Sequence, residues 1–224
     1  MKAVYNCCIP DPWLDVAKFL LKEKSVEPVY WIGWSDYDFR FNLPQDINFN
    51  NCTFHDINDA WKGIFPKEIS NIPSISLDGE IIDRISSSEL LAIKMMDRLD
   101  PDRRSFTFEE RQRHFRRLLS QWLGIIDNLE VELFISPSIP HRVFDFAFYI
   151  GCQLRGVKTI LYKMTPFQDV LIPISDVFSL PGYIKEDYNN LKNKFIEQYL
   201  PDEILYSIEG SEENCRKVFF LFPF

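Results

Sequence analysis

The sequence predicts an α/β fold in which a Rossmann-like parallel sheet is flanked by helices and followed by a helical C-terminal segment. Two stretches, residues 3–33 and 131–162, each show the strand–helix–strand pattern of a βαβ unit in a parallel sheet. The composition agrees, because 46% hydrophobic and 26% charged residues are typical of globular proteins and exclude disordered, collagen-like and coiled-coil chains. We therefore expect a Rossmann-like domain over residues 1–165 and an acidic helical segment over residues 166–224.

The first unit begins with a strand at Ala3–Cys8 and continues with a helix at Trp13–Lys24, where apolar residues recur at helical spacing. A second strand is expected at Pro28–Gly33. The loop at residues 9–12 contains no glycine, which excludes a dinucleotide-binding fingerprint, because a pyrophosphate must approach the backbone closely there. Asp11 lies in this loop, where it either contacts substrate or only shapes a turn.

The middle of the chain is less regular. It predicts a short strand at Cys52–His55, a helical turn at Asp59–Phe65 and a helix at Ser88–Leu99. This last helix ends before Pro101, because the residue preceding a proline avoids the α-helical region. Trp61 lies in the helical turn beside polar residues. An exposed tryptophan in that setting is a sugar-stacking surface, whereas the commoner alternative is a buried core residue.

The clearest helix begins after Thr107, which forms a capping box with Glu110. The second unit then follows as a strand at Val131–Ile135, a helix at Arg142–Leu154 and a strand at Val157–Tyr162. The helix that begins after Thr107 carries an apolar stripe at steps of three and four residues, formed by Phe115, Leu118, Leu119, Trp122, Ile126 and Leu129.

The C-terminal part of the sequence is acidic. From residue 169 it holds ten Asp or Glu against five Lys or Arg, and helices are expected at Tyr183–Leu200 and Pro201–Ile208. The sequence ends in the apolar run Val218–Phe224. Such a run at a free terminus would be an exposed apolar patch, so we expect either that it docks into the core or that a second domain follows it.

Charge and cysteine content exclude several classes of protein. With 33 Asp and Glu against 25 Lys and Arg, the net charge of −8 argues against a nucleic-acid partner. No apolar run approaches the ~18 residues that span a bilayer, and the N-terminus lacks the features of a secretory signal. Five cysteines without metal-binding spacing predict reduced thiols in a cytoplasmic protein. The three histidines never occur at ligand spacing, so no metal site is expected.

The best candidate site is the turn between the first strand and the helix of the second unit. His141 and Asp145 are four residues apart, so on a helix they share one face and the carboxylate orients the imidazole as a catalytic base. Ser136, Ser138 and Arg142 lie at the same turn, where main-chain N–H groups and a guanidinium favour an anionic substrate. The structural alternative is that Ser138 caps the helix and His141 is a surface residue.

A second candidate is the segment 98–117, which contains seven arginines in twenty residues. Arg103, Arg104 and Arg111 lie near the start of the helix, and we expect them to contact phosphate or another anionic group of a substrate. Arg113, Arg116 and Arg117 lie on the polar side of this helix, away from its apolar stripe. The structural alternative is a solvated helix face on which the arginines pair with neighbouring glutamates.

Two segments carry a resemblance to a known family. Residues 133–149 (LFISPSIPHRVFDFAFY) with 156–162 (GVKTILY) resemble a segment of bacterial surface and capsular polysaccharide biosynthesis proteins, in which a strand ends in a Pro-His turn and a helix follows. Residues 97–100 (DRLD) and 106–114 (FTFEERQRH) resemble the segment just upstream. That family is similar to the N-terminal half of two-domain, GT-B type glycosyltransferases. This half mostly holds the acceptor, and a second half, expected beyond this chain, binds the nucleotide-sugar.

The resemblance implies a glycosyltransferase-like protein of cell-surface polysaccharide biosynthesis, which transfers a sugar from a nucleotide-sugar to a glycan acceptor. In this interpretation His141 is the general base, Asp145 supports it and Arg142 steadies anionic groups. No cofactor is expected besides the nucleotide-sugar as co-substrate. The expected partner is a sugar or glycan acceptor, with peripheral membrane association and the oligomeric state left open.

Two other classes remain as alternatives. One is a non-catalytic module that binds an acceptor without turnover. The other is a serine hydrolase that uses Ser136 or Ser138 with His141 and Asp145. Against the hydrolase, the sequence has no GxSxG elbow at this turn, and a histidine three residues after a serine on a proline-rich turn is an awkward geometry for a triad.

Overall fold

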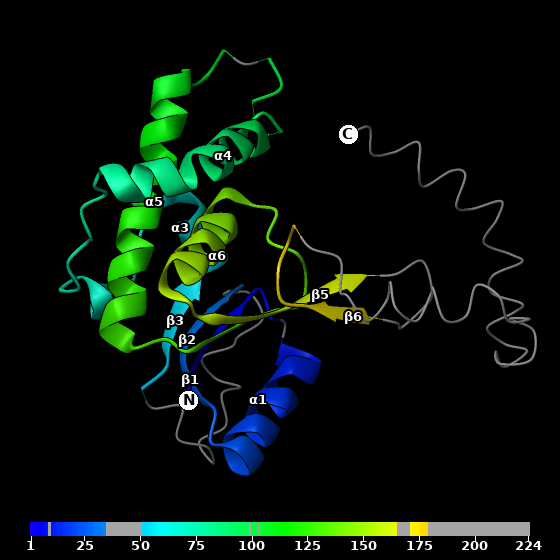
Figure 1. Ribbon diagram of the computed structural model, residues 1–224. Coiled ribbons are helices and arrows are strands. Elements are labelled where there is room, and N and C mark those ends of the chain that lie inside the picture. The colour runs from blue at the N-terminus through cyan, green and yellow to red at the C-terminus, as the bar shows by residue number, and fades with distance from the viewer. Residues whose placement is uncertain (9, 35–50, 99, 103, 165–170, 179–224) are drawn as a thin grey trace, which may run out of the picture. The chain divides into compact units, whose positions relative to one another are not determined.

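The computed structural model describes residues 1–8, 10–34, 51–98, 100–102, 104–164 and 171–178. It confirms the α/β class: the strands form one mostly parallel sheet that is flanked by helices (Figure 1). The chain divides into two compact units, Met1–Leu161 and Tyr162–Phe224. Most described elements, and the candidate site, belong to the first unit.

The sheet has six strands in the order β3-β2-β1-β4-β5-β6. The pairs β1–β2, β2–β3, β1–β4 and β4–β5 are all parallel. From β1 the chain continues to β2 on one side of the sheet, and from β4 it continues to β5 on the other side. The loops that follow β1 and β4 therefore lead in opposite directions. The crevice between two such loops is the topological switch point, where α/β proteins bind ligands. The strands are β1 (Lys2–Asn6), β2 (Glu27–Gly33), β3 (Thr53–Asp56), β4 (Leu133–Ser136), β5 (Lys158–Met164) and β6 (Leu171–Ile174).

Helices cover both faces of the sheet in the first unit. Helix α1 lies on one face, while α3, α5 and α6 lie on the other, and α4 packs across α5 and α6 (Figure 1). The capping box predicted at Thr107 and Glu110 starts α5, and Gly156 ends α6 in the left-handed conformation that glycine adopts without strain. The helices are α1 (Pro10–Lys24), α3 (Ile57–Lys62), α4 (Gly79–Met96), α5 (Phe108–Leu129) and α6 (Val143–Arg155).

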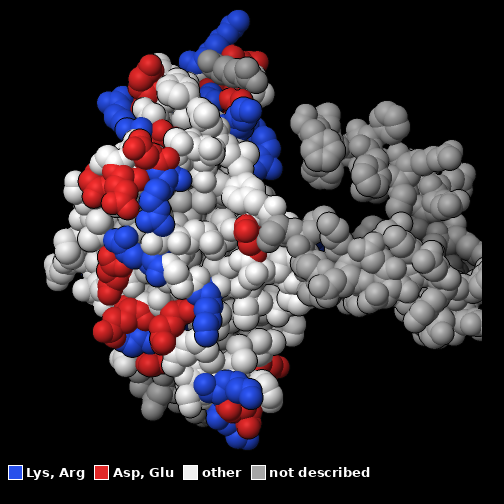
Figure 2. Space-filling view, viewed as in Figure 1, with Lys and Arg blue, Asp and Glu red and all other residues white. Residues whose placement is uncertain are grey.

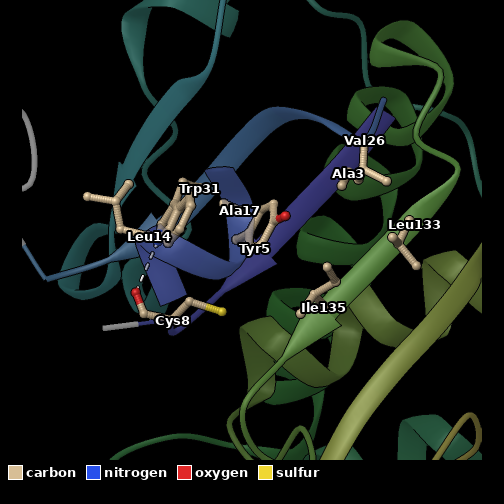
Figure 3. Close-up of a cluster of buried hydrophobic side chains, with 9 residues drawn as sticks. All are labelled: Ala3, Tyr5, Cys8, Leu14, Ala17, Val26, Trp31, Leu133 and Ile135. Atoms are coloured by element: carbon tan, nitrogen blue, oxygen red, sulfur yellow. Dashed lines mark hydrogen bonds between the residues drawn. The ribbon is translucent and has the colours of Figure 1, made fainter. Parts of the chain in front are cut away.

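The core on the α1 face is built around two stacked aromatic rings (Figure 3). The rings of Tyr5 and Trp31 lie 4.5 Å apart and nearly parallel. The indole N–H of Trp31 donates to the carbonyl oxygen of Cys8 at 3.1 Å, which satisfies a polar group that burial would otherwise leave unpaired. Leu14 and Ala17 of α1 pack on this cluster, so the apolar stripe of the predicted helix attaches it to the sheet.

The opposite face has an aromatic core centred on Trp122 of α5. Its ring contacts Tyr30, His55, Phe65 and Phe148 at centroid distances between 4.8 and 5.9 Å. His55 is held by the Tyr30 hydroxyl and the Ile64 carbonyl, each at 2.8 Å. Burial lowers the pKa of His55 to about 4, although the Ile64 carbonyl partly offsets this effect, so the imidazole is neutral and structural.

The structure differs from the predicted elements mainly at helix starts. Helix α4 begins at Gly79 rather than Ser88, because Asp78 caps it by accepting from the Ile81 N–H at 2.9 Å. Three consecutive serines, which are weak helix formers, obscured this start, and packing against α5 overrides their preference. Helix α1 begins at Pro10, since a proline in the first turn has no N–H to leave unsatisfied.

The segment after residue 165 also differs from its expected character. Where only helix was predicted, the described residues form strand β6. The helices expected at Tyr183–Leu200 and Pro201–Ile208, and the apolar run that ends the sequence, lie outside the described residues.

Candidate functional site

A cavity of about 840 Å³ lies among the helices on the α5 face of the sheet. Its walls are the end of α3, the end of α4, the first half of α5 and the loop that follows β4. This volume falls within the range of small-molecule sites. The lining consists of Trp61, Lys62, Met95, Met96, Arg98, Asp100, Phe106, Glu110, Arg111, Arg113, His114, Arg117, His141, Arg142, Val143 and Phe144.

The loop after β4 brings His141 and Arg142 to this cavity, as predicted for the Pro-His turn. The cap of α6 is Arg142, whose main-chain N–H donates to Asp145 Oδ1 at 2.7 Å. Ser138 therefore does not cap the helix. Its carbonyl oxygen instead accepts the Ser136 hydroxyl.

His141 precedes the helix, and this changes its expected pairing. The spacing of four residues brings side chains together only when both lie on the helix, whereas α6 begins at Val143. The imidazole Nδ1 lies 2.9 Å from the carbonyl oxygen of Ile139 instead. A carbonyl can only accept, so this contact fixes the proton on Nδ1 and leaves the lone pair on Nε2. The prediction that Asp145 orients the imidazole is thus wrong in its geometry, and a main-chain carbonyl performs that role.

Asp145 is buried, with 1% of its surface exposed. Its Oδ1 accepts the Arg142 N–H, while no described residue forms a hydrogen bond with its Oδ2. Burial raises the pKa of this carboxyl to about 7, although the Arg142 N–H and guanidinium act in the opposite direction. Asp145 therefore positions the backbone of Arg142 and does not line the cavity itself.

The guanidinium of Arg142 lies near two indole rings. Its central carbon is 5.7 Å from the ring centre of Trp61 and 5.8 Å from that of Trp34, which are cation–π distances. One of its N–H groups also donates to the sulfur of Cys7 at 3.3 Å. Burial and then the charge of Asp145 raise the pKa of the Cys7 thiol to about 12, so Cys7 is a packing residue rather than a nucleophile.

Ser136 lies at the end of β4 and is fully buried. Its hydroxyl donates to the carbonyl oxygen of Ser138 at 2.8 Å and accepts from the side-chain amide of Asn6 at 3.2 Å. These bonds join the ends of β1 and β4 at the switch point. Neither serine pairs with the His141 imidazole.

Arg111 lines the cavity, but its charge is already neutralised. Its guanidinium donates to Asp97 and, at 2.7 Å, to Asp100. Burial alone would raise the pKa of Asp100, but the Ser105 N–H, the Arg111 guanidinium and the Phe106 N–H together lower it to about 2. These ion pairs argue against the prediction that Arg111 holds a ligand, because its guanidinium already joins α5 to the end of α4 and the following loop.

Arg103 and Arg104 are the other two arginines singled out from the sequence near the start of α5. Arg104 is exposed and does not line the cavity. Arg103 lies outside the described residues. Arginines further along α5 line the cavity instead: Arg113 and Arg117, which the sequence placed on a solvated face. The signal that could have found them is their spacing of four residues on one face of the helix, together with His114 between them.

Trp61 lies at the end of α3 and is 42% exposed, so its ring is accessible for a sugar to stack on, which is one of the two alternatives that the sequence leaves open for it. Helix α3 ends at Gly63, which adopts a left-handed conformation. Arg117 donates to the Lys62 carbonyl at 3.1 Å, and His114 pairs with the main chain of Trp61. Residues of α5 therefore hold the tryptophan at the cavity.

The remaining candidates can be placed briefly. Asp11 lies in the first turn of α1, and its side chain is not among those described. Among the described residues, no group of three or more His, Cys, Asp or Glu is arranged to hold a metal ion. No helix in the described part of the chain combines the length and apolarity needed to cross a bilayer.

Comparisons with protein-family models, with curated proteins and with solved structures give no match to this chain. The resemblance to polysaccharide biosynthesis proteins therefore stays an expectation from the sequence. The function has to be inferred from the chemistry of the cavity.

Proposed function

We propose that this chain binds a sugar-containing acceptor in the cavity, as the acceptor-holding part of a glycosyltransferase-like protein of cell-surface polysaccharide biosynthesis. The observation that carries the proposal is the meeting of an exposed indole, an imidazole and several cationic side chains around one hollow of about 840 Å³. The loop after β4 forms one wall, at the carboxyl edge of the sheet where α/β proteins hold ligands.

Trp61 provides a flat apolar surface on which a sugar ring can stack. Its exposure makes the ring accessible, and contacts from α5 to the main chain of α3 fix its position. A fixed aromatic side chain binds a sugar at a low entropic cost, because few rotamers remain to be lost on binding.

His141 is the candidate general base of the transfer step. In that step its Nε2 accepts the proton of an acceptor hydroxyl while the hydroxyl oxygen bonds to the anomeric carbon of the nucleotide-sugar. The bond from that carbon to the diphosphate oxygen breaks, and the nucleoside diphosphate leaves with the bonding electrons. The contact with the Ile139 carbonyl supports this role, since it keeps the lone pair on Nε2.

Acceptor binding is tested first, by titrating the chain with a panel of capsular oligosaccharides in a calorimeter. We expect at least one oligosaccharide to bind, and Trp61→Ala to weaken that binding by about tenfold, which corresponds to the loss of about 1.4 kcal/mol. Phe19→Ala is the matched control, because Phe19 is an exposed aromatic residue on α1 that does not line the cavity. Absence of binding across the panel, or an equal loss in both variants, would overturn the proposal.

Transfer is tested next with the bound oligosaccharide and radiolabelled UDP-sugars. If the chain transfers sugar, His141→Ala should lower the rate by about a hundredfold or more while binding stays within about threefold. Retention of the full transfer rate by this variant would exclude His141 as the base.

A non-catalytic acceptor-binding module is the second candidate. It is favoured by one observation: among the described residues no carboxylate pairs with the His141 imidazole, whose Nδ1 contacts a main-chain carbonyl. Binding of an oligosaccharide without any turnover of nucleotide-sugar would assign this function. The hydrolase alternative has no such support, because the hydroxyl of Ser136 is buried and donates to a carbonyl rather than to histidine.

The cellular compartment belongs to the same proposal. Cys7, Cys8, Cys52 and Cys152 are all free thiols, and three of the four are buried. Free thiols persist in a reducing environment, which supports a cytoplasmic location.

A further inference from the structure

The lining of the cavity is strongly cationic although the chain as a whole carries a net charge of −8. On the face shown in Figure 2, Lys and Arg side chains lie among Asp and Glu side chains. The cavity differs, because only two carboxylates, Asp100 and Glu110, accompany its six basic residues. These six are Lys62, Arg98, Arg111, Arg113, Arg117 and Arg142.

Among the described residues, only one of the six forms an ion pair. Arg111 pairs with Asp97 and Asp100, which also uses one of the two carboxylates of the lining. Glu110 accepts the Thr107 N–H in the capping box, where the start of α5 already favours a negative charge. The described residues therefore do not balance the positive charge of the lining.

The other five basic residues keep their charge. Arg98 and Arg117 each donate to a main-chain carbonyl, of His141 and Lys62 respectively, and a carbonyl carries no countercharge. Lys62 and Arg113 make no ion pair with any described residue. The fifth is Arg142, whose guanidinium contacts two rings and a thiol and makes no ion pair with a described residue, although the buried Asp145 carboxyl, whose pKa is raised to about 7, lies close enough to feel its charge.

Like charges around one hollow repel one another, and a bound polyanion would relieve this repulsion. A carboxylate ligand brings one negative charge, whereas a phosphate monoester brings about 1.5 to 2 and has three acceptor oxygens. Guanidinium groups match these oxygens with paired N–H donors. Five cations without an ion pair to a described residue therefore favour a phosphoryl group over a carboxylate.

We propose that the ligand of this cavity is a phosphorylated sugar, whose phosphoryl group is bound by Arg142 and Arg113 and whose ring stacks on Trp61. Arg142 suits this role because Asp145 fixes its backbone and the indoles fix its guanidinium, so little entropy is lost when it binds an anion. The inference names the substrate class for the proposed acceptor site, and its phosphate contacts are independent of any transfer chemistry.

Three glucose derivatives with the same ring separate the contributions to binding. Methyl glucoside is neutral, glucuronate carries a carboxylate and glucose 1-phosphate carries a phosphoryl group. We expect calorimetric titration of the full chain to give at least about tenfold tighter binding for glucose 1-phosphate than for glucuronate, and the weakest binding for methyl glucoside. Inorganic pyrophosphate should compete with glucose 1-phosphate, and affinity should fall as salt is raised.

Variants identify the residues that bind the phosphoryl group. Arg142→Gln and Arg113→Gln should each weaken the binding of glucose 1-phosphate by about tenfold and leave that of methyl glucoside unchanged. Arg113 is exposed on α5, so its variant keeps the fold even if Arg142→Gln does not. Arg84→Gln is the matched control, because Arg84 is an exposed arginine of α4 that does not line the cavity.

The inference is overturned if glucuronate binds as tightly as glucose 1-phosphate, if no phosphorylated probe binds, or if Arg84→Gln weakens binding as much as the cavity variants do. Its outcome is distinct from that of the transferase proposal. Phosphate-dependent binding through Arg142 without oligosaccharide binding or sugar transfer would keep this inference and reject that proposal. Binding of neutral oligosaccharides alone would do the reverse.

Discussion

Two buried ionisable side chains, Asp145 and His55, have pKa values shifted so that their effects on stability oppose each other. The pKa of Asp145 rises from 3.8 to about 7 in the folded chain, so its contribution to stability is full below pH 3.8 and is lost as the pH rises to 7. The pKa of His55 falls from 6.5 to about 4, so its contribution is full above pH 6.5 and is lost as the pH falls to 4. Between pH 4 and 6.5 the two slopes partly cancel.

Substitutions should separate the two slopes. In Asp145→Asn the opposing carboxyl effect is removed, so the free energy of unfolding should rise with pH between 4 and 6.5, by about 1.4 kcal/mol per pH unit from His55, and the pKa of His114, which burial also lowers, acts in the same direction. In His55→Gln the carboxyl effect remains, so stability should fall over the same interval. Urea unfolding at half-unit steps of pH measures both slopes, and the same slope in both variants would contradict the assignment.

The connection between α4 and α5 depends on one buried arginine. Arg111 of α5 bridges Asp97 at the end of α4 and Asp100 in the following loop, and Asp100 also accepts main-chain N–H groups of Ser105 and Phe106. Arg111→Met leaves two carboxylates without their cation. We expect it to destabilise the chain by about 3 to 5 kcal/mol, the range for breaking a buried pair.

The midpoint of urea unfolding measures this loss. Arg113→Met is the control, since Arg113 lies two residues away on the same helix and is exposed without an ion pair among the described residues. Equal midpoints for the two variants would show that the buried bridge contributes little. A loss confined to Arg111→Met would confirm its role in joining the two helices.

Helix α5 also makes a close approach to the chain between α3 and α4. A Cβ atom on Gly124 would lie 2.1 Å from the carbonyl oxygen of Pro73, a distance that requires the backbone to move. Ser120 on the same helix exchanges hydrogen bonds with the main chain of Ile75, which holds the two segments together. Gly124 is therefore needed for this contact and not for a special backbone conformation.

The substitution Gly124→Ala should destabilise the chain by about 1 to 3 kcal/mol, the usual cost of overpacking. Gly79→Ala is the matched control, because a Cβ atom there meets nothing within 4 Å and Gly79 begins α4. That variant should be unchanged or more stable by about 0.4 to 1 kcal/mol. Thermal unfolding distinguishes the two, and a stabilised Gly124→Ala would contradict the close approach.

The sheet order explains why residues far apart in the sequence meet at one edge. Because β1 lies between β2 and β4, the residues that follow β1 come next to those that follow β4. Asn6 thereby reaches Ser136, and Cys7 reaches Arg142. The guanidinium of Arg142 also lies near Trp34, the residue after β2. The order of the strands thus determines where the β4–α6 loop, which forms one wall of the cavity, is placed.

Local patterns predicted most of the fold. The two βαβ units, the capping box of α5 and the glycine that ends α6 follow from hydrophobic spacing and from residues with strong positional preferences, which act over a few neighbours in the chain. The start of α4 and strand β6 were not predicted, because contacts with distant segments stabilise them.

The candidate site was predicted only in part. His141, Arg142 and Trp61 line the cavity as the sequence suggested, since each lies in a turn or helix end beside the sheet. The pairing of His141 with Asp145 was wrong, because His141 precedes the helix, which begins at Val143, and its imidazole contacts the Ile139 carbonyl instead. Arg113 and Arg117 were assigned to solvent, because helical periodicity separates apolar from polar faces but does not show what lies opposite a polar face.

The sequence by itself determined the α/β class, the parallel sheet and the turn that carries His141 and Arg142, because these depend on short-range preferences and on the burial of apolar stripes. Only the tertiary structure decided which charges remain uncompensated around the cavity. The charge of an arginine is neutralised where two carboxylates reach it, as at Arg111, and is not neutralised where no carboxylate of the described part of the chain pairs with it, as at Arg113. Electrostatic pairing depends on distances between segments that are separate in the chain, and folding alone sets those distances.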